Sequence, residues 1–248
     1  MDADAVEPTT RDCSKGSLAL TVVVVTWNAA DPLVNCLRSL EAERRAISLE
    51  LFVVDNASTD SSADIARQIA PWAKVIENYE NRGFAAANNQ ALTQAQGRYV
   101  ALLNPDAEVL DHALVSLVRY MDKVPDVGAA GPMIVTSSGE VDFRCARRFP
   151  TLWSEFCEVS RLTRRFPKHR FFSGAPMGHW DHKDSRVVDA LSGACMVVRR
   201  EALEQVGLLD EDFFMYSEDT ELCFRLKRAG WRVVYWPKAR VRHWGGYS

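Results

Sequence analysis

The chain has 248 residues, of which 47% are hydrophobic and 25% charged, a composition typical of a globular protein with one large core. Its formal net charge of −3 excludes a global positive field that would attract nucleic acid or an anionic membrane. The longest apolar run, residues 18–25, is too short for a transmembrane helix. Residues 1–18 are polar and acidic and lack the hydrophobic region of a secretory signal, so we predict a disordered N-terminal segment there.

Six cysteines are scattered singly along the chain, without a Cys-x-x-Cys pair. In a chain of this length that pattern favours reduced thiols over a disulfide framework or a metal cluster. We therefore expect a cytoplasmic protein.

Strand and helix patterns alternate through the first half of the chain. Residues 20–28 are β-branched and nearly all apolar, as expected for a strand covered on both faces, and residues 33–42 place apolar side chains at helical spacing. Strict alternation predicts an α/β fold with a mostly parallel central sheet and helices on both faces. The further strands are predicted at 49–56, 74–79, 98–104 and 127–135, and the further helices at 61–70, 83–97 and 111–123.

The alternation breaks between about 136 and 186. Within this region, residues 144–170 contain eight Lys or Arg and two acids, interleaved with Phe and Trp. Such a segment is either a charged, solvated loop or a basic, aromatic insert that shapes an acceptor site at a membrane surface. Regular patterns return at 187–200, followed by helices at 201–206 and 217–229 and a strand at 231–237.

Polar side chains stand where three predicted strands end. The residues are Thr26 and Asn28 at the first strand, Asp55 and Asn56 at the second, and Asn104 and Asp106 after the strand at 98–104. Ligands of open parallel sheets bind beyond the carboxyl ends of the strands. Each residue alone could serve as a helix cap or turn former, but three such ends on one edge favour a shared ligand.

The common nucleotide-binding fingerprints are absent from the sequence. No G-x-G-x-x-G follows the first strand, and no G-x-x-x-x-G-K-[ST] occurs anywhere, which argues against a Rossmann dehydrogenase and a P-loop enzyme. A diphosphate bound at this edge would need another source of positive charge. Mg²⁺ or Mn²⁺ held by Asp106 would supply it, because both ions prefer carboxylate oxygens.

The helix predicted from near Ser217 begins with two acids that fall on different faces. Asp219 leads an apolar face, whereas Glu218 falls on a charged face that we expect to be exposed to solvent. A buried carboxylate in the first turn of a helix suits a general base, since the helix dipole favours its ionised form. An N-terminal cap is the alternative for Asp219. The apolar face continues with Leu222, Cys223 and Leu226.

Several single polar residues have two interpretations each. Asn88 is the polar member of an otherwise apolar face on the Ala-rich helix, where its amide contacts either backbone or a ligand. Arg82, at the start of that helix, is either a surface cation or part of a phosphate site at the N-terminus. His243 is either a metal ligand or an ordinary surface histidine. Asp111 is expected to cap the helix that follows it.

Six stretches, in the same order, resemble glycosyltransferase family 2 and in particular its rhamnosyltransferase-like members. The resemblance runs from about residue 20 to the end and is weakest over 136–186. It implies a single domain of GT-A fold over 19–248, with a nucleotide-binding half at 19–135 and an acceptor-binding and catalytic half at 136–248. The stretches are VVVTWN, VVDNASTD, ENRGFAAANN, LLNPDAEV, VDALSGACMVVRREALEQVGLLDEDFFMYSEDTELCFRLKRAGW and RHWGG.

The resemblance also implies roles for the residues of the first half. It makes Thr26, Asn28 and Asp55 contacts to the base and ribose of a nucleotide-sugar donor. Arg82 and Asn88 resemble further donor-side positions.

In the second set of motifs, Asn104-Pro105-Asp106 stands where the family has Asp-x-Asp, so that Asp106 matches the metal-binding carboxylate. Asn104 replaces the first Asp of that motif, which removes one charge from the metal side, and it is expected to be a further contact to the donor nucleotide. Asp219 matches the catalytic base, and His243 resembles a position that in some members faces the metal and diphosphate. Gly193 would let the backbone approach the reacting sugar closely.

These features predict an inverting, metal-dependent glycosyltransferase that uses Mg²⁺ or Mn²⁺ in cell-surface polysaccharide synthesis. Its donor is expected to be dTDP-rhamnose, or alternatively a UDP-hexose, and its acceptor a hydroxyl of a glycan or polyprenyl-linked sugar. Residues 144–170 are the expected peripheral contact with the inner face of the membrane.

Two other classes of function are compatible with parts of the pattern. A degenerate domain that binds the nucleotide sugar without turnover is favoured by Asn104 and opposed by the intact Asp219. A nucleotidyltransferase is opposed by the stretch TWNAADP, which lacks the Gly and basic residues of a phosphate loop.

Overall fold

The computed structural model describes residues 18–245, apart from 167, 168, 170, 173, 176 and 178. The predicted disordered segment 1–18 therefore lies outside the described residues, except for residue 18. The five cysteines within this range are buried and free, as the sequence predicts.

A nine-stranded sheet forms the centre of the fold, in the order β3-β2-β1-β4-β10-β6-β11-β5, with β8 paired to β11. The first four of these strands are parallel, and β6 and β11 run in the same direction as them, whereas β10, β5 and β8 run antiparallel to their neighbours. The sheet is thus mostly parallel. The strands are β1 (Leu20–Thr26), β2 (Leu49–Asp55), β3 (Lys74–Glu77), β4 (Tyr99–Leu103), β5 (Ala107–Leu110), β6 (Val127–Val135), β8 (Arg186–Val187), β10 (Cys195–Arg199) and β11 (Arg232–His243).

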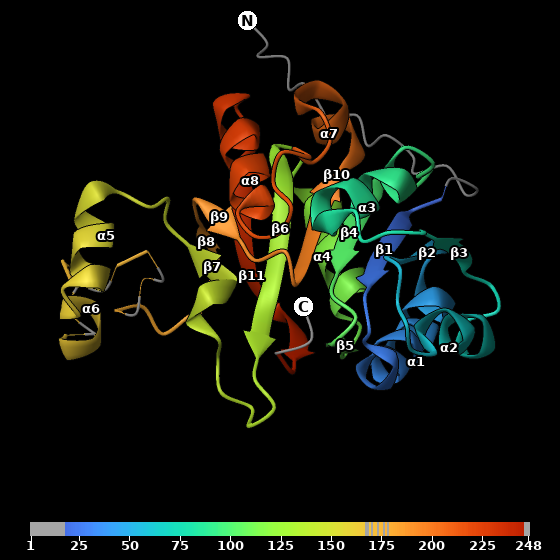
Figure 1. Ribbon diagram of the computed structural model, residues 1–248. Coiled ribbons are helices and arrows are strands. Elements are labelled where there is room, and N and C mark those ends of the chain that lie inside the picture. The colour runs from blue at the N-terminus through green and yellow to red at the C-terminus, as the bar shows by residue number, and fades with distance from the viewer. Residues whose placement is uncertain are drawn as a thin grey trace, which may run out of the picture.

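Helices cover both faces of this sheet (Figure 1). Alternate residues of β1 explain the two layers, because Val23 and Val25 join one apolar cluster and Val22 and Val24 the other. The first cluster is closed by α3 (Gly83–Leu92), α7 (Arg200–Val206) and α8 (Glu218–Arg228), and the second by α1 (Ala30–Ala46), α2 (Ser62–Ile69) and α4 (Ala113–Lys123). The predicted single α/β domain, with a mostly parallel central sheet and helices on both faces, is confirmed.

The region after residue 107 departs from the predicted element boundaries. β5 was not predicted, and β11 continues to His243 because its far end pairs with β5. The prediction that Asp111 caps a helix is wrong. After β5 the chain turns through two residues of left-handed backbone, Asp111 (φ 49°) and His112 (φ 56°), and α4 begins at Ala113 without a side-chain cap.

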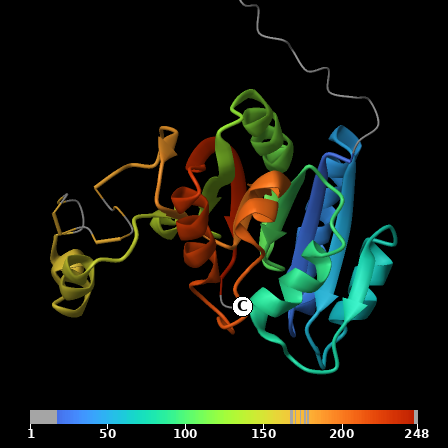
Figure 2. The ribbon, with the colours of Figure 1, turned by 90° about the horizontal axis from the view of Figure 1, so that it is seen from above.

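The insert of residues 136–186 forms a short turn and strand followed by an arm. η1 (Phe143–Cys145) leads into β7 (Ala146–Arg147), which pairs with β9 (Ala190–Leu191). The arm contains α5 (Leu152–Val159) and α6 (Leu162–Arg165), and both views show it at the side of the molecule opposite β2 and β3 (Figures 1 and 2). Within the described ranges, none of the helices has the length and apolar character needed to cross a bilayer.

Candidate functional site

The three polar strand ends meet at one edge of the sheet. β1 lies between β2 and β4, and Thr26 is the direct partner of Asp55 in the parallel register. Thr26 is buried, and its hydroxyl has no hydrogen-bond partner among the described residues. Asp55 accepts hydrogen bonds through Oδ1 from the backbone N–H and the hydroxyl of Ser58. Burial is the largest influence on Asp55 and raises the pKa of its carboxyl.

Asn28 connects the loops that follow β1 and β2. It has left-handed backbone (φ 49°), and its Oδ1 accepts from the backbone N–H of Thr59 at 2.7 Å and from the Thr59 hydroxyl at 3.1 Å. Its own N–H donates to Ser58 Oγ at 2.9 Å. The side-chain oxygen of Asn28 therefore stabilises the rim of the edge.

Asn56, one of the polar residues predicted at the strand ends, holds the neighbouring loop in place. Its buried amide donates to Asn81 Oδ1 at 2.7 Å and to the Gly83 carbonyl at 3.2 Å, and its oxygen accepts from Asn78 Nδ2 and the Arg82 N–H. These bonds attach the 78–83 loop to the end of β2. They bring Arg82, whose side chain is exposed, to the start of α3 beside the edge.

Asn88 is buried, and its Nδ2 donates to the Phe84 carbonyl at 2.9 Å within α3. This contact matches the interpretation of a satisfied core asparagine. The adjacent Asn89 makes the longer-range contacts, since its Nδ2 donates to the Leu209 carbonyl at 2.8 Å and to Glu211 Oε1 at 2.9 Å. Its Oδ1 accepts from the Leu209 N–H at 3.1 Å. Asn89 thus joins α3 to the segment that leads into α8.

Asp106 and His243 come together because β5 and β11 pair antiparallel, with His243 opposite Ala107. His243 Nε2 lies 3.0 Å from Asp106 Oδ1 and 3.4 Å from Asn104 Nδ2. Asp106 is fully buried, yet within the described part of the chain neither of its carboxylate oxygens has a hydrogen-bond partner. Burying such a charge is costly unless a cation or donor compensates it.

The pair therefore fits a divalent cation as a partial site. Mg²⁺ is commonly held by one or two carboxylates and takes its remaining ligands from water and substrate phosphates. No cluster of three or more His, Cys, Asp or Glu side chains suited to a metal occurs among the residues that the structure describes. Most ligands of an ion at Asp106 would then come from a bound diphosphate and water.

A cleft of about 420 Å³ lies next to this pair. Among the predicted site residues it is lined by Asn104, Gly193, Asp219 and His243. The structure thus collects the predicted sugar-side and catalytic positions in one cavity with His243, whereas the other predicted metal ligand, Asp106, is fully buried and lies outside the lining. The predicted base and ribose contacts, together with Arg82 and Asn88, lie outside its lining. The further lining residues include Phe84, Asp142, Arg144, Arg147, Ser192, Tyr216 and Glu218.

Asp219 is buried, as predicted, and accepts four hydrogen bonds. Its Oδ2 accepts from the Gly193 N–H and from Arg147 Nη2, both at 2.9 Å. Its Oδ1 accepts from the N–H of Thr220 at 2.6 Å and from the Thr220 hydroxyl at 3.1 Å. A carboxylate offers about four lone-pair positions, so this set occupies them. Arg147 was not predicted to have a role, because only the fold brings the insert to α8.

Gly193 contributes its N–H rather than a close approach of backbone. A Cβ at this position would stand 3.5 Å from Asp219 Cβ and 3.8 Å from Phe84 Cε1, which are ordinary contacts. The space that a larger residue would occupy is the cleft beside Asp219.

The prediction that Glu218 is exposed to solvent is wrong. Its exposed fraction is 6%, it lines the cleft, and its Oε2 has no hydrogen-bond partner in the described structure. Left-handed backbone at Tyr216 (φ 68°) and Ser217 (φ 75°) turns the chain into α8 so that the first helical turn forms a wall of the cleft. Burial raises the pKa of the Glu218 carboxyl to about 7.

Two solved structures share this fold and confirm the predicted GT-A architecture. GalNAc-T7, crystallised with UDP, GalNAc and Mn²⁺, superposes with a TM-score of 0.67 at 17% identity, over 94% of this chain and 45% of that one. The Pyrobaculum calidifontis mannosyltransferase PcManGT, in complex with GDP-Man and Mn²⁺, gives a TM-score of 0.64 at 24% identity, over 92% of this chain and 58% of that one. The chain thus spans about half the length of these two proteins, and at such identities the likeness concerns the fold.

Sequence relatives carry the comparison further. The N-acetylglucosaminyl-diphospho-decaprenol L-rhamnosyltransferase of Mycobacterium tuberculosis is 32% identical over 241 residues, which are 92% of this chain and 77% of that protein. The rhamnosyltransferase WbbL of Escherichia coli K12 is 27% identical over 176 residues, 67% of this chain and 62% of the relative. The model of the family described as "Glycosyltransferase like family 2" matches residues 18–246. The chain therefore belongs to glycosyltransferase family 2.

Proposed function

We propose that the protein is an inverting, metal-dependent glycosyltransferase of cell-surface polysaccharide synthesis. Its donor is L-rhamnose carried by dTDP, and its acceptor is a hydroxyl of a glycan or polyprenyl-linked sugar on the cytoplasmic side of the membrane. The observation that carries the proposal is the cleft in which Asp219 lies in the same cavity as Asn104 and His243. The names of the mycobacterial and Escherichia coli relatives support rhamnose as the sugar.

The donor lies across the edge of the sheet in this proposal. Thr26 and Asp55 receive the nucleoside, because both are buried polar groups at the strand ends and the Thr26 hydroxyl has no partner among the described residues. Asn28 orders the rim, and Arg82 stands at the helix start where a phosphate is favoured. Asp106 and His243 would hold Mg²⁺ or Mn²⁺, which supplies positive charge that stabilises the leaving diphosphate when bound.

The acceptor hydroxyl lies over Asp219. Its proton passes to a carboxylate oxygen of Asp219, and its oxygen attacks the anomeric carbon from the side opposite the diphosphate. The bond from that carbon to the diphosphate oxygen breaks, and the electron pair leaves with the diphosphate, so the configuration is inverted. Gly193 and Thr220 hold the carboxylate in place through backbone N–H groups during this step.

Asp219 must free a lone pair before it can accept that proton. Of its four donors, the Gly193 and Thr220 N–H groups belong to the backbone, and the Thr220 hydroxyl binds Oδ1 from the adjacent residue. The Arg147 guanidinium, which binds Oδ2, is the end of a long side chain from the insert. Arg147 is therefore the donor that gives way. We assign it a positioning role, in which it occupies the hydroxyl's place until the acceptor arrives.

A donor screen followed by a transfer assay tests the function. Because a ligand that binds only the folded state raises its apparent stability, dTDP-rhamnose with Mn²⁺ or Mg²⁺ is expected to raise the melting temperature more than UDP-hexoses. Asp219→Asn should keep this shift while transfer falls by roughly three orders of magnitude. An equal loss of donor binding in that variant would contradict the base assignment.

The alternative is a domain that holds the nucleotide sugar without turnover. Asn104 favours it, since the residue brings an amide where a second carboxylate would strengthen the metal site. Donor binding without any transfer, to acceptors from glycan and polyprenyl-linked classes, would support this alternative. A larger thermal shift with a UDP-hexose would replace the donor assignment.

A further inference from the structure

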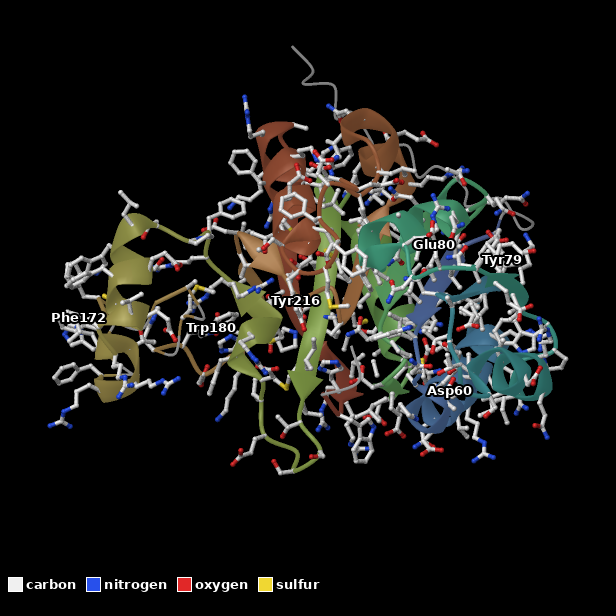
Figure 3. The ribbon with its side chains drawn as sticks, in the orientation of Figure 1. Asp60, Tyr79, Glu80, Phe172, Trp180 and Tyr216 are labelled. Carbon is white, nitrogen blue, oxygen red and sulfur yellow. The ribbon has the colours of Figure 1, made fainter. Side chains whose placement is uncertain are left out.

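Apolar side chains are exposed on the α5–α6 arm, which we define as residues 151–172. Leu152, Phe156 and Val159 lie on one face of α5, at helical spacing, and the exposed fraction is 93% for Leu152 and 85% for Val159. Figure 3 shows Phe172 on this arm, at the end of the molecule opposite Tyr79. A helix normally turns such a face to a core, but here it is left uncovered by the described part of the chain.

The exposed face rests on a cluster of aromatic rings. Trp153 lies 5.5 Å from Phe156 and 4.9 Å from Phe171, measured between ring centroids, and its indole N–H donates to the Phe171 carbonyl at 3.0 Å. Phe166 and Phe172 pack at 5.6 Å. At the start of α5, Thr151 and Ser154 form a reciprocal capping box. These contacts order the arm without using the side chains of Leu152 and Val159.

Positive charge adjoins this apolar face. Arg161, Arg164 and Arg165 are exposed at α6, directly after α5 in the chain. Apolar and aromatic side chains next to arginines are typical of segments that lie in the interface of an anionic bilayer. A second copy of the chain fits less well, because two such faces would bring like charges together.

The arm also follows closely in the chain after residues that line the cleft. Arg144 and Arg147 line the cleft, and α5 begins five residues after Arg147. A polar head bound in the cleft could therefore belong to a molecule whose apolar part lies in the layer that the arm contacts.

We propose that the α5–α6 arm docks the protein on an anionic phospholipid bilayer. Leu152, Phe156 and Val159 enter the acyl boundary, while the three arginines of α6 contact lipid phosphates. The global charge of −3 does not oppose this contact, since residues 144–170 form a local basic segment with eight cations and two acids. The proposal goes beyond the transferase function and does not depend on the donor.

Vesicle co-sedimentation of the purified protein tests this contact. Vesicles of phosphatidylglycerol and phosphatidylcholine should bind the protein at least tenfold more tightly than vesicles of phosphatidylcholine alone. Leu152→Glu combined with Val159→Glu should weaken binding at least tenfold, and Arg164→Gln with Arg165→Gln should weaken it about fivefold per arginine. Tyr79→Glu is the matched control, because it places an acid at an exposed aromatic on the opposite end and should leave vesicle binding unchanged.

Three outcomes would overturn the proposal. They are wild-type protein that does not sediment with anionic vesicles, arm variants that sediment as well as the wild type, and an arm that instead mediates dimerisation. Sedimentation velocity reveals the last case, as a dimer that the Leu152→Glu/Val159→Glu variant abolishes. Donor-induced thermal shifts of the same variants separate the two proposals, since loss of vesicle binding with intact donor binding concerns the arm alone.

Discussion

Arg147 shows how a residue from the insert can control the reactivity of a carboxylate on α8. Its guanidinium occupies a lone pair of Asp219 that an acceptor hydroxyl would need. If Arg147 leaves Asp219 only when the acceptor binds, it also prevents Asp219 from activating water while the donor is bound without an acceptor. A hydrogen bond to a charged group contributes about 1.5–3 kcal/mol, enough for this selectivity to be measurable.

Arg147→Gln is accordingly expected to raise the ratio of donor hydrolysis to sugar transfer about tenfold. Release of nucleoside diphosphate with and without acceptor measures the two rates. Arg148→Gln removes the neighbouring exposed cation and should leave the ratio unchanged. An unaltered ratio in the Arg147 variant, or a parallel fall of both rates, would show that Arg147 is only structural.

Glu218 gives the stability of the protein a dependence on pH. Burial raises the pKa of its carboxyl from 4.5 to about 7, so between these values the folded state holds a proton that the unfolded state has lost. The stabilising effect of this proton is complete below about pH 4.5 and is lost as the pH rises through 7. Glu218→Gln should therefore be more stable than the wild type above pH 7, by about 1–3 kcal/mol.

Urea unfolding of both proteins at pH 5 and pH 8 measures this difference in the free energy of unfolding. The advantage of the glutamine variant should grow between the two pH values. Glu201→Gln, at an exposed position in the first turn of α7, is the control and should show little change. A difference that is the same at both pH values would contradict the assignment of a raised pKa to Glu218.

The elements of the first half could be predicted because each carries its own period. The run 20–28 is nearly all apolar, as in a strand covered on both faces, and 33–42 places apolar residues at helical spacing, so neither pattern depends on distant contacts. β5 could not be predicted, since four residues after a turn hold no recognisable period and gain their structure from pairing with β11. The antiparallel direction of β10 could not be predicted either, because its apolar sequence is typical of a buried strand of either direction.

Some residues of the candidate site could be identified from local sequence patterns, whereas others depend on contacts between distant parts of the chain. Asp219 could be identified because its helix has an apolar face. The burial of Glu218 depends on the left-handed backbone of the preceding loop, which the spacing of residues within the helix cannot predict. Arg147 depends on the pairing of β7 with β9, which delivers the insert to α8. Gly83 also acts at long range, since a Cβ there would lie 2.5 Å from the Phe214 carbonyl oxygen, where α3 meets the segment before α8.

The molecule as a whole assembles the metal-side pair from distant parts of the chain. Asp106 follows the first half of the fold and His243 closes the last strand, and they meet only when β5 and β11 are paired. Folding thus brings a fully buried carboxylate, which has no hydrogen-bond partner within the described residues, to 3.0 Å from a histidine ring nitrogen. Burial of this carboxylate destabilises the folded state, and we expect binding of a cation together with a diphosphate to offset that destabilisation.

Asp106→Asn should consequently abolish the additional thermal stabilisation that Mn²⁺ gives in the presence of a nucleoside diphosphate. Without ligand the variant should unfold at the same temperature as the wild type or higher, because the buried charge is gone. Asp111→Asn is the matched control from the same stretch, an exposed acid that should leave both temperatures unchanged. A Mn²⁺-dependent shift that persists in the Asp106 variant would show that the cation binds elsewhere. A lower melting temperature without ligand would instead show that the Asp106 carboxylate stabilises the fold.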